Sequence, residues 1–310
     1  MPSLAPAPRV LVVGSANIDF TVATAHLPRP GETVTGGTLL VSHGGKGANQ
    51  AVAARRLGAE VRFVACVGED ASGYQLRAAL EKEGIGVAGV SMTDRAATGT
   101  ALIVVDAAGR NQIAVAPGAN WALTVEMVER RVDDLAWAEI VMCQLETPVA
   151  TVAWVLGEAR RRGRLSLLNP APMRDEAREL VALADYLTPN ETEAERLSGV
   201  AVRDPASAAV AARALRTRGA STVIVTLGAQ GALACTADGQ VSIPALPVAV
   251  VDTTAAGDAF NASLAVALGE ARALPDALRF ASATAALACT RRGAQPSLPR
   301  RDEVETLLGA

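Results

Sequence analysis

Short apolar runs alternate along this chain with segments in which apolar residues recur at helical spacing. Parallel strands are joined by crossover connections that are usually helices, so the alternation predicts a mostly parallel sheet with helices on both faces. We expect strands at residues 9–14, 61–67, 140–145, 165–168, 186–188 and 222–226. We expect helices at residues 49–57, 72–83, 151–162 and 206–218.

Two regions, residues 20–42 and 98–116, break the alternation with short strand patterns around turn residues such as Gly109. We interpret them as a small β-sheet that stands off the main domain. Because ligands of parallel sheets bind beyond the carboxyl ends of the strands, such a sheet would act as a lid that excludes water. The alternative is an ordinary antiparallel extension of the main sheet.

Composition limits the classes of protein. The chain has 310 residues, half of them hydrophobic, which is enough for one large α/β domain over residues 1–310. A formal net charge of −3 gives no electrostatic reason to expect nucleic-acid binding. No apolar run is long enough to span a bilayer, and the N-terminal tail lacks the apolar core of a signal peptide. We therefore expect a soluble, cytoplasmic protein that binds neither nucleic acid nor membranes.

Cysteine and histidine usage narrows the chemistry further. The four cysteines are widely spaced, without a CxxC pair, and lie among apolar neighbours, which indicates reduced core residues. The chain has only two histidines, which disfavours a histidine-rich metal centre. Carboxylates are therefore the candidate acid and base groups.

One segment, PVAVVDTTAAGDAFN, combines strand, turn and helix signals. We expect a buried strand over residues 248–251 and a helix from Asp258. Small side chains at Ala255, Ala256 and Gly257 let a ligand approach the main chain, whose free amides at a helix start attract negative charge. Asp258 is then a candidate general base for a substrate hydroxyl during phosphoryl transfer. The alternative is that Asp258 only caps the helix.

Polar residues after two other strands suit a sugar. Asn17 and Asp19 stand two residues apart, so in an extended chain both side chains point to one face, toward a ring of hydroxyls. Glu146 follows an apolar strand, VMCQLE, and its alternative role is a helix-start charge before Pro148. A glycine-rich loop lies between these residues in the sequence. Its spacing differs from that of a Walker A loop. Its glycines permit close main-chain approach, and its last residue points toward the ligand. The loop comprises Gly44, Gly45, Lys46, Gly47, Ala48 and Asn49.

Two further segments are candidates for nucleotide binding. Asn190 and Glu193 are suited to hold a Mg²⁺-bound phosphate through water, although the text NETE is also typical of a helix N-terminus. Glycines after a strand can wrap phosphates, as in TLGAQG, whereas the same residues also make an ordinary hairpin turn. This second segment comprises Thr226, Leu227, Gly228, Ala229, Gln230 and Gly231.

Eight motifs occur together in one order: GSANID, GGKGANQAVAARRLGA, QLE, NPAP, TPNETEAE, VTLGAQGA, VDTTAAGDAFN and TRRGAQPS. With this set the chain resembles the PfkB carbohydrate kinase family from about Val10 to the C-terminal helix. GGKGANQAV and TRRGAQPS resemble its ribose-specific branch rather than the fructokinase or adenosine kinase branches. The resemblance implies a Rossmann-like three-layer α/β/α domain with a mostly parallel central sheet and a lid formed by about residues 20–42 and 98–116. It also implies ATP-dependent phosphorylation of D-ribose at the 5-hydroxyl, which yields ribose 5-phosphate and ADP.

The resemblance also implies roles for individual residues. Asp258 is the expected base, and the expected anion hole comprises Ala255, Ala256 and Gly257. The residues expected to hold ribose are Asn17, Asp19, Gly45, Lys46, Gly47, Ala48, Asn49, Glu146 and Asp258. The residues expected to face ATP are Asn190, Thr226, Leu227, Gly228, Ala229, Gln230, Gly231, Gly257, Asp258 and Ser282. Ser282 stands where family members often have a histidine near adenine, which leaves base selectivity open.

Two cations and a second subunit follow from the same resemblance. Mg²⁺ would be held by Glu193 through water. K⁺ would lie beside the anion hole and order the 252–258 turn by its charge. Its expected site, formed mostly by main-chain carbonyls, comprises Asp252, Thr254, Ala288, Arg291, Gly293 and Ser297. A homodimer is expected to form through the lid, with the stretches LLVS and ALIVV as strand edges that pair.

Three other functions are weighed against this one. A kinase of another small sugar, such as 2-deoxyribose or fructose, would keep the chemistry and change the hydroxyl contacts. A non-catalytic sugar-binding regulator would need an altered turn around Asp258, and that turn is intact. A nicotinamide-dependent dehydrogenase is disfavoured because no GxGxxG motif follows Val13.

Overall fold

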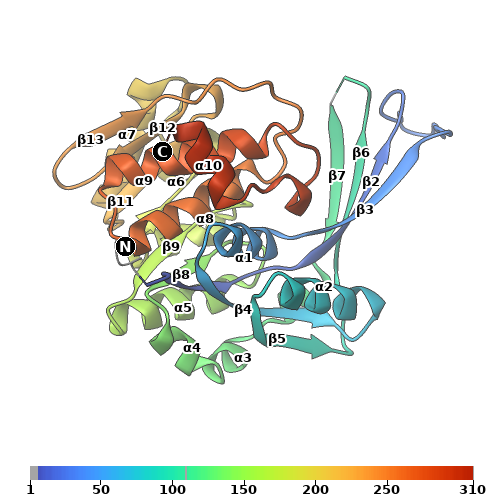
Figure 1. Ribbon diagram of the computed structural model, residues 1–310, viewed down its shortest axis with the longest axis horizontal. Coiled ribbons are helices and arrows are strands. Elements are labelled where there is room, and N and C mark those ends of the chain that lie inside the picture. The colour runs from blue at the N-terminus through green and yellow to red at the C-terminus, as the bar shows by residue number, and fades with distance from the viewer. Residues whose placement is uncertain (1–5, 109, 310) are drawn as a thin grey trace.

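The computed structural model describes residues 6–108 and 110–309, which form two β-sheets (Figure 1). The predicted turn residue Gly109, and residues 1–5 and 310 at the ends of the predicted domain, lie outside the described part. Within that part, the larger sheet has nine strands and the smaller sheet has four. Because the two sheets are separate, the predicted small sheet is confirmed, and the alternative of an extension of the main sheet is wrong.

The larger sheet is mostly parallel, as predicted. Its strands lie in the spatial order β13 (Gln240–Ile243), β12 (Ala232–Cys235), β11 (Thr222–Thr226), β10 (Tyr186–Leu187), β9 (Leu165–Leu168), β8 (Ile140–Cys143), β1 (Arg9–Val13), β4 (Glu60–Gly68) and β5 (Gly86–Thr93). Neighbours from β11 to β5 are parallel. Strands β12 and β13 add an antiparallel hairpin beyond β11.

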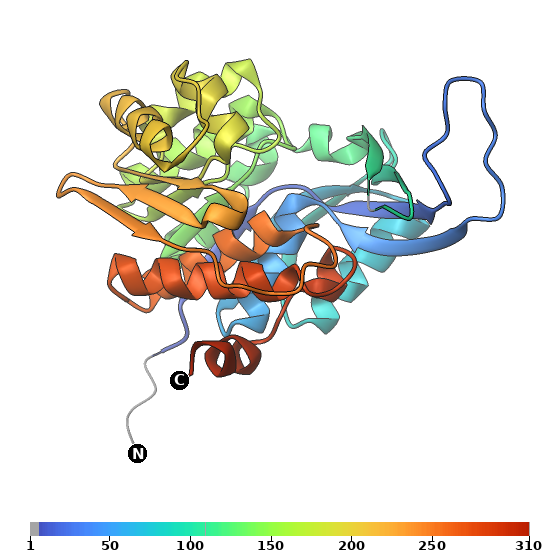
Figure 2. The same cartoon turned by 90° about the horizontal axis from the view of Figure 1, so that it is seen from above.

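Helices cover both faces of this sheet (Figure 2). One face carries α1 (Lys46–Arg56), α2 (Ala71–Lys82), α8 (Ala256–Gly269), α9 (Leu274–Ala288) and α10 (Arg301–Leu308). The other carries α3 (Val125–Glu129), α4 (Val132–Trp137), α5 (Val149–Arg161), α6 (Glu191–Ser198) and α7 (Pro205–Thr217). Side chains alternate along β1, so Val10 and Val12 pack in the first core and Leu11 and Val13 in the second. The predicted three-layer architecture is confirmed.

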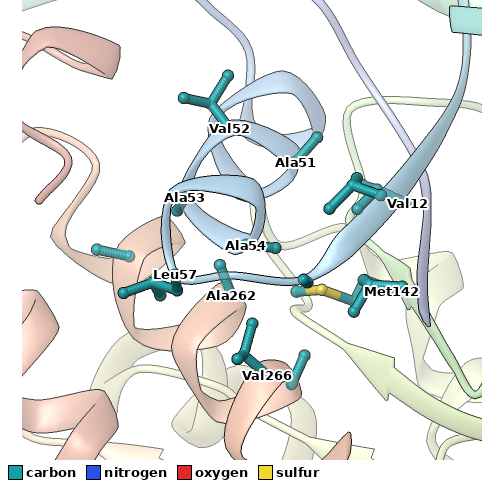
Figure 3. Packing of buried hydrophobic residues seen from close by; sticks show 14 of the residues in the cluster. Val12, Ala51, Val52, Ala53, Ala54, Leu57, Met142, Ala262 and Val266 are labelled. Atoms are coloured by element: carbon teal, nitrogen blue, oxygen red, sulfur yellow. The ribbon is translucent and has the colours of Figure 1, made fainter. Parts of the chain in front are cut away.

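Helix α1 packs directly on α8. Figure 3 shows Ala54 of α1 and Leu57, which directly follows α1, beside Ala262 and Val266 of α8, with Met142 of β8 close to both helices. Alanine side chains carry little bulk, so the two helices can approach each other closely. The functional site is built at the amino ends of this helix pair.

The smaller sheet projects from the main body in Figures 1 and 2. Its order is β3 (Thr38–Gly44), β2 (Asn17–Ala23), β6 (Gly99–Val105) and β7 (Asn111–Ala116). Strands β2 and β6 are parallel, and the other neighbours are antiparallel. The prediction that ALIVV is an edge is wrong, because β6 lies between β2 and β7. The edges are β7 and β3, which contains LLVS.

Most predicted elements agree with the structure to within a few residues, but the buried strand at residues 248–251 is wrong. Residues 244–250 have no regular structure, and Val250 and Val251 are 64% and 54% exposed. β-Branched residues favour a strand only where they find strand neighbours to pack against. Here the N–H of Val251 instead donates to the carbonyl of Cys289, directly after α9.

Two predictions from composition can be compared with the described residues. None of their helices is long and apolar enough to cross a bilayer. Cys66, Cys143 and Cys235 are buried and Cys289 is partly buried, and the thiols of all four are free.

Candidate active site

Asp258 lies in the first turn of α8 and is 5% exposed. Its Oδ2 accepts a hydrogen bond of 2.9 Å from Nδ2 of Asn49, and its Oδ1 accepts one of 3.0 Å from Nε2 of Gln50. Both donors belong to the first turns of α1. The N-cap of α8 is Ala255, and the helix has no side-chain capping bond. The interpretation of Asp258 as only a helix cap is therefore wrong.

The turn before α8 presents main-chain amides. Ala255 adopts a left-handed conformation with φ of 59°, which costs a residue with a side chain about 1–2 kcal/mol. The N–H of Ala256 already donates to the carbonyl of Thr253 at 3.2 Å. Within residues 6–108 and 110–309, the amides of Gly257 and Asp258 donate to no protein oxygen. A Cβ at Gly257 would meet open space, so an anion can reach these amides and the positive end of the helix dipole.

The main chain of the glycine-rich loop contacts other parts of the protein. The N–H of Lys46, the first residue of α1, donates to Oε2 of Glu146 at 2.9 Å. The N–H of Gly47 donates to Oγ of Ser15 at 3.2 Å. A Cβ at Gly47 would lie 2.5 Å from the amide nitrogen of Ser15, and one at Gly45 would lie 2.8 Å from the backbone of the β1–β2 turn. The close main-chain approach of these glycines is therefore to that turn.

The carboxylate of Glu146 contacts the amino end of α1. Its Oε2 also accepts a hydrogen bond of 2.5 Å from Oγ of Ser15, and its other oxygen accepts none from the described residues. Strand β8 ends at Cys143, so Glu146 lies in the following loop. Helix α5 has Pro148 at its N-cap and, among the described residues, no side-chain cap. The helix start to which Glu146 forms a hydrogen bond is that of α1.

Asn17 and Asp19 lie on β2 and point to the same face of the smaller sheet, as their spacing predicts. Both are buried. Oδ1 of Asn17 accepts a hydrogen bond of 2.7 Å from Nδ2 of Asn120, which fixes the orientation of the Asn17 amide. Gly44 on the paired strand leaves room for the Asp19 carboxylate, because a Cβ there would lie 2.0 Å from Oδ2.

Negative side chains gather around Lys46. Burial raises the pKa of Asp19 to about 6, with smaller contributions from Glu146 and Asp258. Burial also raises the pKa of Asp258, although Lys46 and the two amide donors lower it. For Lys46, burial favours the neutral form, but the facing carboxylates of Asp258 and Glu146 raise its pKa above the ordinary value. Four segments distant in sequence, β2, α1, the loop after β8 and α8, therefore contribute charges to one site.

The nucleotide candidates meet where β10 and β11 end. Asn190 and Thr226 form an isolated parallel bridge. Asn190 and Glu193 form a capping box at the start of α6, so the interpretation as a helix N-terminus is confirmed. Gly228–Gln230 form an exposed 3₁₀ turn between antiparallel β11 and β12, so the hairpin interpretation of TLGAQG is confirmed too. Burial raises the pKa of Glu193, although the N–H of Asn190 donates to its carboxylate.

The segments predicted to bind K⁺ meet at Asp252. One carboxylate oxygen accepts the N–H of Gly293 at 2.8 Å, and the other accepts the N–H and hydroxyl of Thr254 at 2.9 and 2.7 Å. The guanidinium of Arg291 is paired with Glu303. The other residues predicted for K⁺, Ala288 and Ser297, are buried. Ser282 of α9, predicted to face ATP, is buried too.

Several buried polar residues that hold these side chains in place were not predicted from the sequence. They are Ser15, Gln50, Asn120, Gln144 and Asn169. A partial signal was present, because Gln50 follows Asn49 directly and Gln144 and Asn169 belong to the motifs QLE and NPAP. A polar side chain that ends an apolar strand needs a hydrogen-bond partner once it is buried.

In this three-layer α/β fold, a buried carboxylate beside helix amides without partners among the described residues suits an enzyme that transfers a phosphoryl group to a small molecule. The family model described as "pfkB family carbohydrate kinase" matches residues 7–301. The chain therefore belongs to the PfkB family of carbohydrate kinases.

Individual relatives are similar over nearly the whole chain. A ribokinase of Haemophilus influenzae is 41% identical over 297 residues, which cover 96% of this chain and 97% of that protein. A deoxyribokinase of Salmonella typhi is 35% identical over 300 residues, with coverage of 96% and 98%. The structure of Arabidopsis thaliana ribokinase complexed with ribose and ATP matches with a TM-score of 0.91 and 35% identity, and covers 98% of this chain and 99% of that one.

We predict that Asp19→Asn stabilises the fold. Because the folded pKa of Asp19 is about 6, the folded protein binds more protons than the unfolded chain between about pH 4 and 6, so the stability linked to Asp19 is present below that window and is lost as the pH rises through it. At about pH 8 the variant should have a free energy of unfolding about 1–3 kcal/mol above wild type. The difference should shrink below about pH 4.

Urea unfolding at the two pH values measures this difference. Asp238→Asn, at an exposed turn, is the control and should not change the free energy of unfolding at either pH. A variant no more stable than wild type at the higher pH would contradict the prediction.

Proposed function

We propose that the protein is an ATP-dependent kinase that transfers the γ-phosphoryl group to the 5-hydroxyl of D-ribose, with ribose 5-phosphate and ADP as products. The observation that carries the proposal is the position of Asp258, a buried carboxylate beside free amides at the amino end of α8. Ribokinases among its relatives support ribose as the substrate. We place the reaction in the cytoplasm, where ATP is available and free thiols such as those of this chain persist.

In the proposed reaction Asp258 orients the attacking hydroxyl and receives its proton. A carboxylate of ordinary pKa is a weak base for an alcohol. In a loose transition state, however, the hydroxyl loses its proton late, so orientation and charge stabilisation dominate. The amides of Gly257 and Asp258 are suited to stabilise the charge that develops on the phosphoryl oxygens, in the turn shaped by Ala255 and Ala256.

Ribose would occupy the site between the lid and α1. Asp19 and Glu146 offer carboxylate acceptors to its hydroxyls, and Lys46 offers a cationic donor. Oδ1 of Asn49 is buried and accepts no hydrogen bond from the described residues, so a substrate hydroxyl would satisfy it. Gly45, Gly47 and Ala48 would then act by shaping the loop.

ATP would lie along the ends of β10 and β11, next to this site. Its proposed contacts are Asn190, Ser282 and the segment from Thr226 to Gly231, in which Gly228–Gln230 are exposed. Glu193 is suited to hold Mg²⁺ through water, because it is a buried carboxylate. Its electrostatic interaction with Lys46 indicates that it lies near the proposed sugar site. Bound Mg²⁺ would neutralise charge on the ATP phosphates.

We propose that K⁺ activates the enzyme. Asp252 ties the turn before α8 to Gly293, so a cation held by nearby carbonyl oxygens would order the turn that carries the free amides. Initial rates should be several-fold higher in K⁺ than in choline buffer of equal ionic strength. Asp252→Ala should abolish the difference. Equal wild-type rates in K⁺, Na⁺ and choline would contradict the proposal.

We propose that the protein forms a dimer through one face of the lid. The strand register places Leu40, Thr21, Ile103 and Ile113 in one row across the sheet, and Leu40 and Ile113 are 50% and 57% exposed. Exposed apolar rows of this kind are typical of interfaces.

Ile113→Asp should therefore give a monomer by light scattering. Val210→Asp, at an exposed apolar position on α7, is the control and should remain a dimer. A monomeric wild type at working concentration would rule the dimer out.

We predict that Asp258→Asn lowers kcat by about a thousandfold or more, because the variant keeps the shape of the site and loses the proton acceptor. Calorimetry should show that ribose still binds. Ordinary turnover in the variant would exclude the proposed role of Asp258.

A coupled ADP-release assay with wild type should give the highest kcat/KM for ribose among ribose, 2-deoxyribose and fructose. The deoxyribokinase relative makes 2-deoxyribose the second candidate. A higher kcat/KM for 2-deoxyribose would select that candidate.

A further inference from the structure

We propose that Gln50 and Gln144 are positioning residues that hold Asp258 as an ionised acceptor aimed at the substrate. This inference rests on the proposed function and deepens it. The two glutamines form a buried chain of amides that ends at the Asp258 carboxylate, and neither residue was expected from the sequence to have a role.

The chain of hydrogen bonds is continuous. Nε2 of Gln144 donates to Oε1 of Gln50 at 2.6 Å, and Nε2 of Gln50 donates to Oδ1 of Asp258 at 3.0 Å. Nε2 of Gln50 also donates to Oδ1 of Asn169 at 3.3 Å. The amide of Gln50 therefore uses its oxygen and both N–H groups inside the protein.

The chain has a direction that the charge of Asp258 imposes. An ionised carboxylate only accepts hydrogen bonds, so Gln50 must turn its nitrogen toward Asp258. The oxygen of Gln50 then faces Gln144, which must present its own nitrogen. A protonated Asp258 would not require this order, so the chain favours the ionised form.

The burial of Gln144 argues against a role in packing alone. Both glutamines have no exposed surface. Oε1 of Gln144 is buried and accepts no hydrogen bond from the described residues. Gly14 leaves room for this oxygen, since a Cβ at Gly14 would lie 2.1 Å from it. A leucine would fill the same space without an unsatisfied polar atom, so the amide is best explained by its donation to Gln50.

The two amide donors also set the direction of the carboxylate. Asn49 and Gln50 each bind a different oxygen of Asp258. Each oxygen keeps a lone pair for another donor, such as the substrate hydroxyl. Burial raises the pKa of Asp258, the cation of Lys46 and these two donors lower it, and the charge of Glu146 raises it. The Gln variants leave Lys46, Glu146 and Asp19 in place, so loss of the Gln50 donor should extend the protonated form of Asp258 to higher pH.

The test compares pH profiles of kcat for Gln50→Leu, Gln144→Leu and wild type. In Gln50→Leu the midpoint of the acid limb should move to higher pH by about one unit or more. Below the wild-type midpoint, kcat should then be about tenfold lower. KM for ribose should stay within about threefold of wild type. Gln144→Leu should shift the midpoint in the same direction by less, because Gln50 loses only the partner that orients it.

Ser263→Ala is the control. Ser263 lies on α8, as Asp258 does, and among the described residues its buried hydroxyl donates only to carbonyls of that helix. Its acid limb should not move. Circular dichroism below the melting temperature establishes folding, and Gln144→Leu alone decides the test if Gln50→Leu does not fold. An unshifted acid limb in folded variants overturns the proposal. If Asp258→Asn is inactive but the limb does not shift, only this inference fails, whereas turnover in Asp258→Asn removes the proposed function as well.

Discussion

The contact between the amino ends of α1 and α8 is the interaction on which the site depends. Burial of a carboxylate without partners costs several kcal/mol, and both partners of Asp258 come from α1, as Asn49 and Gln50. Their side chains reach Asp258 because α1 and α8 pack against each other, with Ala54 of α1 beside Ala262 of α8 (Figure 3). The packing of small residues in the core therefore positions the polar side chains that gather beyond the carboxyl ends of β1 and β8.

The same site holds charge that disfavours folding. The carboxylates of Asp258, Glu146 and Glu193 act on the cation of Lys46, and Asp19 interacts with the first two. Burial raises the pKa of Asp19, Asp258 and Glu193. Ala255 adds a strained left-handed turn directly before α8. Features that oppose stability cluster where a protein binds or reacts. Hydroxyl groups of a sugar would satisfy these acceptors, which the fold leaves only partly satisfied.

Local patterns predicted the layers of the fold, but not the partners of individual groups. Alternating apolar runs identified β9 and β11 with their observed bounds. The strand predicted at residues 248–251 is wrong because β-branched composition does not say whether a pairing edge is available. For the same reason ALIVV was placed at an edge although β6 is internal. The chain of Gln144, Gln50 and Asp258 joins residues distant in sequence, so local patterns indicated its members only in part and not the hydrogen bonds between them.

Strand β2 connects the proposed sugar site to the proposed dimer face through its register. Asp19 and Thr21 are two residues apart, so both face the same side of the smaller sheet. Asp19 points into the site, and Thr21 belongs to the row that contains Leu40 and Ile113. A slip of one residue in the pairing of β2 would turn Asp19 away from the site and remove Thr21 from that row at the same time. The pairing of β2 with β3 and β6 therefore places Asp19, a proposed sugar contact, and the apolar row on one face, and a partner seated on the row would lie next to the proposed sugar site.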